Sequence, residues 1–119
     1  MTPRILIIDD EEMIQRLYRD ELQRDGYAVD TAGSGQDALI KAALTSYDVI
    51  VLDIELPDMS GLEVLQKLRL AAPTAPIVIN TAYAVYRTDF QSWLADDYIV
   101  KSSDIGPLRR KIGELVSVR

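Results

Sequence analysis

Three aspartates stand directly after runs of apolar residues. Asp9 and Asp10 follow the Ile- and Leu-rich run 5–8, and Asp53 follows the Val- and Ile-rich run 49–52. Short apolar runs of this kind are typical of strands that a parallel sheet buries on both faces. If the two strands are neighbours, their carboxyl ends lie at the same edge, where open α/β sheets place their ligand sites.

Such an arrangement would gather three carboxylates in one crevice. Like charges this close repel one another and raise a pKa unless a cation lies between them. The sequence contains neither histidine nor cysteine, so the ligands would be oxygen atoms. Oxygen ligands favour Mg²⁺ over zinc or copper. The residues alone therefore predict a magnesium site at Asp9, Asp10 and Asp53.

The composition limits the class of protein. With 119 residues and 48% hydrophobic content, we expect residues 1–119 to form a single folded domain. A net charge of −6 argues against nucleic-acid binding through phosphate contacts. The lack of cysteine excludes disulfides and thiol chemistry, and the lack of histidine removes the usual general base. No apolar run reaches the roughly 20 residues that span a bilayer, and we expect no signal peptide, no membrane contact and a cytoplasmic location.

Strand-like runs alternate with helical patterns along the chain. The expected strands span residues 4–8, 27–31, 49–52, 77–80 and 98–100. The first helical stripe contains Met13, Ile14, Leu17 and Leu22, and it ends at Gly26. Three more helices are expected, over 34–44 with a Ser or Gly cap, after Gly61 with Leu62, Leu65 and Leu68, and around Ile105, Leu108, Ile112 and Leu115 with Ser103 or Asp104 as the cap. This alternation predicts a three-layer α/β/α sandwich with a five-stranded, parallel, doubly wound sheet.

The segment 82–96 is the least regular part of the sequence. It contains four of the chain's eight aromatic residues, namely Tyr83, Tyr86, Phe90 and Trp93. Thr, Asp and Ser residues between them lower its helix propensity. We therefore expect a fourth helix that is short or irregular.

Two further polar residues follow expected strand ends. Thr81 comes after the run 77–80, and Lys101 comes after 98–100. Together with the aspartates, these positions resemble the receiver domain of two-component response regulators, the CheY-like family, over essentially the whole chain. The segments 53–61, 81–83 and 96–101 match the family as well. Each motif alone is a weak signal, but their order and spacing together are specific. The resemblance implies the strand order 2-1-3-4-5 found in flavodoxin and CheY.

The resemblance also implies the chemistry of the site. Asp53 would be the phosphoacceptor, whose carboxylate forms an aspartyl phosphate with a phosphoryl group from a histidine kinase. Asp9, Asp10, Asp53 and the backbone carbonyl of Glu55 would hold Mg²⁺. Lys101 would pair with the phosphoryl oxygens as a point charge, and the Thr81 hydroxyl would donate to another of them.

A conformational switch is the next implication of the resemblance. Phosphorylation would draw Thr81 toward the new oxygens, and Tyr98 would turn inward, where the small Ala82 leaves room for its ring. From the residues alone, a half-buried edge aromatic is an equally good interpretation of Tyr98. The face formed by the fourth helix, the fifth strand and the last helix would change shape and control partner binding. Glu55 and Tyr83 would tune dephosphorylation.

The sequence departs from the family pattern in two places. The lysine is followed by Ser102 rather than proline, so a trans peptide bond is expected there. The interval from Thr81 to Lys101 is about two residues shorter than usual, and the shortening falls on the fourth helix. The first departure bears on the loop and on the placement of Lys101, and the second on the output face and a homodimer made through it. Neither alters the acidic cluster.

The resulting prediction is a phospho-accepting receiver domain of a two-component system or phosphorelay. Its partners would be a histidine kinase or phosphotransfer protein, an unidentified downstream protein and, as one possibility, a second copy of the chain. It would not be an enzyme beyond its own phosphorylation and dephosphorylation.

Other functions compete with this prediction. The first is a phosphorylation-independent protein-binding module on the same fold. A flavin carrier is disfavoured because the acidic residues 9–12 would repel a phosphate. A phosphatase of the haloacid dehalogenase type is disfavoured because Glu55 stands where its second aspartate belongs. Taken singly, an Asp pair before a helix is more often a cap than a metal site, and only the coincidence of several strand ends favours function.

Overall fold

Five parallel strands form one sheet in the order β2-β1-β3-β4-β5. The computed structural model describes residues 2–82 and 94–117. Its elements are β1 (Arg4–Ile8), α1 (Glu12–Arg24), β2 (Ala28–Ala32), α2 (Gly35–Leu44), β3 (Val49–Leu52), α3 (Gly61–Ala71), β4 (Ile77–Thr81), β5 (Asp97–Val100) and α5 (Gly106–Ser117). The expected strand order is confirmed. The expectation of an irregular fourth helix falls on residues 83–93, which lie outside the described residues.

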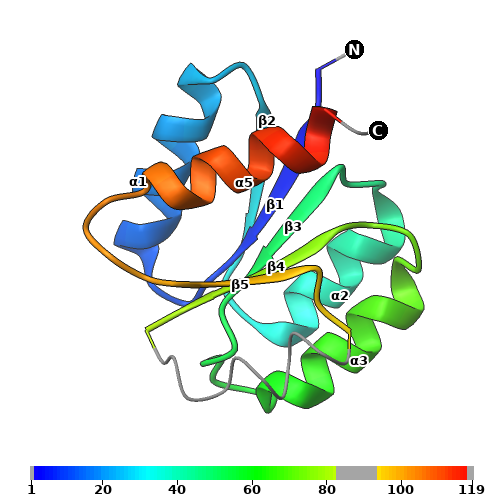
Figure 1. Cartoon of the computed structure of the whole chain (residues 1–119). Helices are drawn as coiled ribbons and strands as arrows, with labels where there is room; N and C mark the ends of the chain where they lie inside the picture. The colour runs from blue at the N-terminus through cyan, green and yellow to red at the C-terminus, as the bar shows by residue number, and fades with distance from the viewer. Residues whose placement is uncertain (1, 83–93, 118–119) are drawn as a thin grey trace.

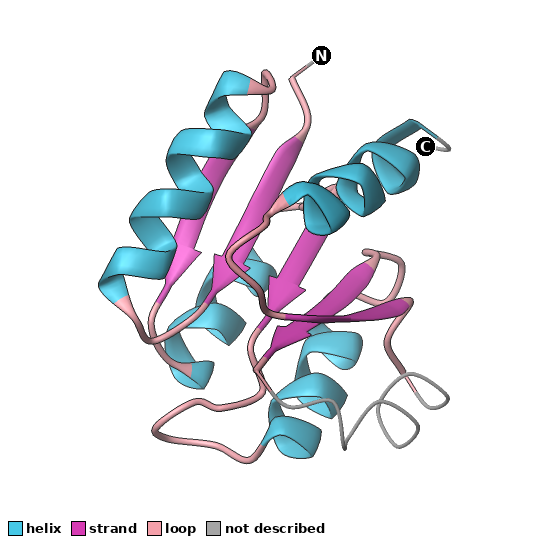
Figure 2. Ribbon diagram, turned by 60° about the vertical axis from the view of Figure 1, so that its left-hand side comes forward, coloured by secondary structure: helices cyan, strands magenta, loops and turns pink. Residues whose placement is uncertain are grey.

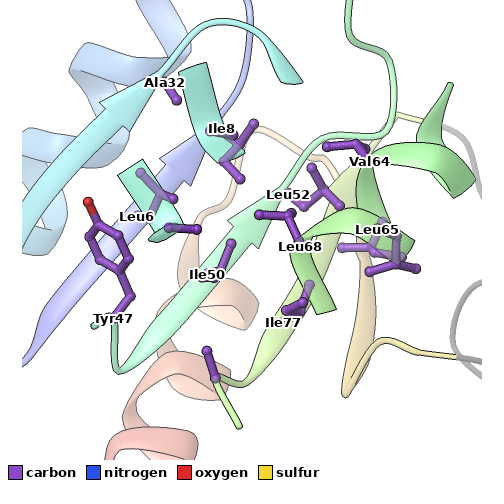
Figure 3. Close-up of a cluster of buried hydrophobic side chains, with 14 of the residues drawn as sticks. Leu6, Ile8, Ala32, Tyr47, Ile50, Leu52, Val64, Leu65, Leu68 and Ile77 are labelled. Carbon is purple, nitrogen blue, oxygen red and sulfur yellow. The ribbon is translucent and has the colours of Figure 1, made fainter. Parts of the chain in front are cut away.

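The helices cover both faces of the sheet. In Figure 1, α1 and α5 lie on one face and α2 and α3 on the other, and Figure 2 shows the same layers from a second direction. Each face has its own group of buried side chains. The α2–α3 cluster includes Leu6, Ile8, Ile50, Leu52, Val64, Leu65 and Leu68 (Figure 3), and the α1–α5 cluster includes Ile5, Ile7, Tyr18, Leu22, Val51, Leu108 and Ile112.

The apolar runs contain no alternating polar residues because helices cover both faces of the sheet. Successive side chains of a strand point to opposite faces, so Ile5 and Ile7 enter the α1–α5 cluster while Leu6 and Ile8 enter the α2–α3 cluster. Since both faces are buried, every position of the run must be apolar. No helix in the described part of the chain is long and apolar enough to cross a membrane.

Polar side chains accept hydrogen bonds from backbone N–H groups in the first turns of three helices. Ser34 Oγ accepts the Asp37 N–H at 3.1 Å at the start of α2, and Ser60 Oγ accepts the Glu63 N–H at 3.2 Å at the start of α3. At α5, Asp104 Oδ1 accepts the Gly106 N–H at 2.8 Å, so Asp104, of the two expected candidates, accepts a bond from the first turn. These bonds satisfy backbone donors that a helix start leaves unpaired.

The expected apolar stripe of α1 was wrong in part. Met13 and Leu17 are 81% and 48% exposed, whereas Tyr18 and Leu22 are buried. The buried stripe of α1 therefore includes Tyr18, which also has a polar partner inside the protein, described below. In α3, similarly, Leu62 is partly exposed and Val64 is buried with Leu65 and Leu68.

Candidate functional site

The site residues lie at the carboxyl edge of the sheet because backbone pairing continues past the strand ends. The Asp53 N–H donates to the Ile8 carbonyl at 2.9 Å, which aligns the residues after β1 and β3. The Lys101 N–H donates to the Thr81 carbonyl at 2.7 Å, which aligns β5 with β4. Parallel pairing of these four strands therefore brings residues 9, 53, 81 and 101 to one edge.

Three carboxylates meet there. One oxygen each from Asp9, Asp10 and Asp53 lies within 4.8 Å of the others. Asp9 and Asp53 are only 2% and 4% exposed, while Asp10 is open to solvent. The structure thus places the three predicted carboxylates together, in a geometry that offers oxygen ligands to a divalent cation.

Lys101 bridges the two buried carboxylates. Its Nζ lies 2.7 Å from Asp9 Oδ2 and 2.8 Å from Asp53 Oδ2. Burial raises the pKa of Asp9, even though Lys101 and the Glu11 N–H favour its charged form. Burial alone would lower the pKa of Lys101, but its hydrogen bonds to Asp53 and Asp9 outweigh burial and raise it. Lys101 is therefore a fixed positive charge that compensates the carboxylates in this state.

Backbone donors hold the other oxygen of each buried carboxylate. Asp9 Oδ1 accepts the Glu11 N–H at 2.9 Å, and Asp53 Oδ1 accepts the Glu55 N–H at 3.0 Å. Each carboxylate thus accepts a hydrogen bond from a backbone amide through one oxygen and contacts Lys101 through the other. For Asp53, these two contacts fix the orientation of the carboxylate before any ligand binds.

The Thr81 hydroxyl is the exceptional polar group of the site. Thr81 is fully buried, and its Oγ1 has no hydrogen-bond partner among the residues that the structure describes. A buried polar group without a partner costs about 1–3 kcal/mol. Such a hydroxyl, at the same sheet edge as Asp53 and Lys101, is suited to donate to an anion that binds there.

The remaining predicted residues differ in their placement. Tyr98 is 3% exposed and packs in the α2–α3 cluster, while Ala82 and the Glu55 side chain are exposed. Tyr83 lies outside the described residues. The switch role of Tyr98 and Ala82 and the tuning role of Glu55 and Tyr83 stay predictions. The described residues contain no cis peptide bond, which confirms the trans bond expected between Lys101 and Ser102.

The sequence analysis missed two polar contacts near the site. Asn80 Nδ2 donates to the Tyr18 hydroxyl at 2.8 Å, and both side chains are buried. Gln15 Nε2 donates to the Asp9 carbonyl at 2.6 Å. Asn80 could have been noticed, because an amide in the apolar run 77–80 must find a buried partner. Nothing in the sequence singles out Gln15.

Comparison with known protein families adds a second line of evidence. Residues 5–113 match the model of the response regulator receiver domain. The response regulator ArlR of Staphylococcus aureus is 41% identical over 110 residues, which cover 92% of this chain and 50% of that protein. The chain therefore spans about half the length of the curated relatives it matches.

Solved structures of similar chains agree with the family match. The response regulator TrrA of Thermotoga maritima, in complex with Mg²⁺-BeF, is 46% identical with a TM-score of 0.89 and coverage of 96% of this chain and 99% of that chain. TrrA in complex with the histidine kinase ThkA gives 45% identity, a TM-score of 0.88 and coverage of 97% and 99%. A CheY-like receiver domain from Methanospirillum hungatei gives 32% identity, a TM-score of 0.92 and coverage of 99% and 96%.

Proposed function

This chain belongs to the response regulator receiver domain family, and we propose that Asp53 is the residue that accepts its phosphoryl group from a histidine kinase or phosphotransfer protein. One observation carries the proposal. The Asp53 carboxylate is buried at the carboxyl edge of the sheet, within reach of two further carboxylates and bonded to Lys101. A carboxylate held in this way is oriented for attack on phosphorus.

The residues of the site fit Mg²⁺. The donors are oxygen atoms only, and three carboxylates converge within 4.8 Å. Asp9, Asp10, Asp53 and the Glu55 carbonyl would hold the ion. When bound, Mg²⁺ would supply positive charge against the phosphoryl oxygens, which is the main requirement of phosphoryl transfer. The Mg²⁺-BeF complex of TrrA supports this assignment.

The transfer itself is a displacement at phosphorus. An oxygen of the Asp53 carboxylate forms a bond to phosphorus while the bond from phosphorus to the donor histidine nitrogen breaks, and that nitrogen keeps the electron pair. Lys101 turns from Asp9 toward the new phosphoryl oxygens, which carry about −1.5 to −2 units of charge. The Thr81 hydroxyl, which has no partner among the described residues, donates to another of these oxygens.

The response of the protein follows from these two new contacts. Thr81 ends β4 and Lys101 follows β5, so both contacts act on the ends of these two strands. Tyr98, already buried here, and Ala82 are the proposed switch residues. The resulting face would bind a downstream protein or a second copy of the chain, and phosphorylation would shift the balance between two existing forms.

Several attributes belong to the same proposal. The chain acts as a single domain over residues 1–119 in the cytoplasm, with no enzymatic activity beyond its own phosphorylation and dephosphorylation. Glu55 and Tyr83 would affect the rate at which water removes the phosphoryl group. The histidine kinase complex of TrrA supports a kinase as the partner of this chain.

Intact-mass measurement after incubation with Mg²⁺ and acetyl phosphate tests the proposal. We expect the wild-type chain to gain one phosphoryl group and Asp53→Asn to gain none, because an amide is a poor nucleophile. Asp37→Asn is the matched control, since Asp37 pairs with Lys41 on α2 and does not belong to the cluster of three carboxylates. It should be phosphorylated like the wild type.

Two outcomes would contradict the proposal. Equal labelling of Asp53→Asn would place the acceptor elsewhere. No labelling of the wild type by acetyl phosphate or by a phosphorylated kinase, under conditions that label a control receiver, would favour a phosphorylation-independent binding module.

A further inference from the structure

The loop between β3 and α3, residues 53–60, is fastened to the first turn of α2. Asp58 Oδ1 accepts the Gly35 N–H at 2.8 Å, and Asp58 Oδ2 accepts the Gln36 N–H at 2.9 Å. The partners are 23 and 22 residues apart in the sequence. Figure 1 shows α2 and α3 side by side on one face of the sheet, where this loop joins β3 to α3.

Asp58 shares the start of α2 with a local cap. Ser34 Oγ accepts the Asp37 N–H, so three successive amides of the first turn are bonded by two different side chains. The bonds from the Gln36 and Gly35 N–H groups lower the pKa of Asp58, because they favour its charged form. A negative charge at this end of a helix also interacts favourably with the helix dipole.

The loop is held at three points along its length. At its beginning, Asp53 Oδ1 accepts the Glu55 N–H, and at its end Ser60 Oγ caps α3. Asp58 lies between these points and bonds to a different element. Glu55 is three residues before Asp58, and Pro57 restricts the backbone between them. The position of the Glu55 backbone therefore depends on the Asp58 bonds as well as on Asp53.

We propose that Asp58 is a positioning residue for the metal site, which holds the Glu55 carbonyl toward the acidic cluster by anchoring its loop to the amino end of α2. The inference rests on the proposed function, since it requires that the cluster and this carbonyl hold Mg²⁺. Asp58 itself lies outside the cluster formed by Asp9, Asp10 and Asp53. It acts on the ion only through the backbone of the loop.

A purely structural role is the competing explanation, because Asp58 also caps a helix. Ser34 separates the two explanations. Ser34→Ala and Asp58→Ala each remove a side-chain acceptor from the first turn of α2, but only Asp58 belongs to the loop that carries Glu55. Both variants should lower the melting temperature by about 4 °C, the usual effect of a lost cap in a domain of this size.

The deciding measurement is the dissociation constant for Mg²⁺, obtained from ¹H–¹⁵N NMR titration of the whole chain with MgCl₂. We expect Asp58→Ala to raise this constant about tenfold, as loss of an outer partner of a metal ligand commonly does. Ser34→Ala should change the dissociation constant less than about twofold. The bond that this variant loses, from the Asp37 N–H to Ser34 Oγ, joins α2 only to its own N-cap. An equal constant for Asp58→Ala and the wild type would overturn the inference.

Failure of the inference can be told from failure of the proposed function. If the wild type itself binds no Mg²⁺, the metal site is wrong and the role of Asp58 falls with it. If the wild type binds Mg²⁺ and Asp58→Ala binds it equally well, only the positioning role is wrong.

A second measurement, hydrogen exchange of the wild-type chain, does not depend on whether a variant folds. Coupling between two sites is reciprocal, so saturating MgCl₂ should slow hydrogen exchange at the Gly35 and Gln36 amides. The Asp37 amide, which bonds to Ser34, should change less and serves as the internal control. Exchange at Gly35 and Gln36 that is unaffected by MgCl₂ would overturn the inference.

Discussion

Lys101 places one positive charge between the two buried carboxylates of the site. Its Nζ contacts Asp9 and Asp53 at 2.7 and 2.8 Å, and the side chain is only 15% exposed. The same two carboxylates are proposed ligands of Mg²⁺. The lysine and a bound Mg²⁺ would therefore compete for the same carboxylates.

Lys101→Met should make stability depend on the metal. With EDTA present, the variant leaves two buried negative charges uncompensated, and we expect a loss of about 3 kcal/mol, the usual cost of breaking a buried ion pair. With MgCl₂ present, much of the loss should be recovered, and the variant should bind Mg²⁺ more tightly than the wild type. Thermal unfolding in both buffers measures the effect.

Lys67→Met is the control for this prediction. Lys67 forms an ion pair with Glu63 on α3 in which both side chains are about half exposed, and such surface pairs contribute about 0–1 kcal/mol. Its melting temperature should change little in either buffer. A Lys101→Met protein whose stability is the same in EDTA and MgCl₂ would show that Lys101 does not compensate the carboxylates.

At the scale of elements, the start of α3 approaches the residue after Asp53. A Cβ atom on Gly61 would lie 2.6 Å from Ile54 Cβ and 3.2 Å from the Ile54 carbonyl oxygen. Neither atom is the tip of a flexible side chain, so α3 or the loop would have to move. Gly61 thus allows α3 to pack against the backbone that carries Asp53.

Gly61→Ala should therefore destabilise the protein by about 1–3 kcal/mol, the usual cost of overpacking, and slow phosphorylation of Asp53 by acetyl phosphate. Gly113→Ala is the matched control within α5, where the added Cβ would meet its nearest atom, the Tyr27 hydroxyl oxygen, at 3.9 Å. That variant should gain up to about 1 kcal/mol, since alanine favours helix. Urea unfolding and intact mass check both; equal stability of the two variants would refute the close-packing argument.

At the scale of the whole molecule, the two apolar clusters share one sheet. A strand formed by an unbroken apolar run, such as β1, contributes side chains to both clusters. In addition, Arg109 of α5 bonds through Nε and Nη2 to both carboxylate oxygens of Asp25, the C-cap of α1. This bond ties together the two helices of one face, whereas the strands join the two faces through both clusters. The shared strands therefore predict that the two faces unfold together.

Leu65→Ala and Ile112→Ala test that cooperativity, because both residues are fully buried and they lie in different clusters. Each substitution should lower the free energy of unfolding by about 2–5 kcal/mol. Urea transitions followed by far-ultraviolet circular dichroism and by tyrosine absorbance should coincide in the wild type and in both variants. Separate transitions in either variant would show two independent folding units and contradict the single domain.

The sequence by itself determined the elements and the edge at which the chemistry lies. Unbroken apolar runs predicted strands buried on both faces, and parallel strands bring Asp9, Asp10 and Asp53 to one edge whatever the details of packing. The placement of Thr81 and Lys101 beside them followed from the resemblance to the receiver family. These features depend on local periodicity and on chain order, which a sequence displays directly.

Only the tertiary structure decided which side chains become partners. The bond between Asn80 and Tyr18 joins residues 62 positions apart, and Asp58 reaches Gly35 across 23 positions. In α1, Met13 and Leu17 are exposed, against the expected stripe. Such contacts depend on how two elements lie in space to within about one ångström, the tolerance of a hydrogen bond, and local periodicity carries no information at that precision.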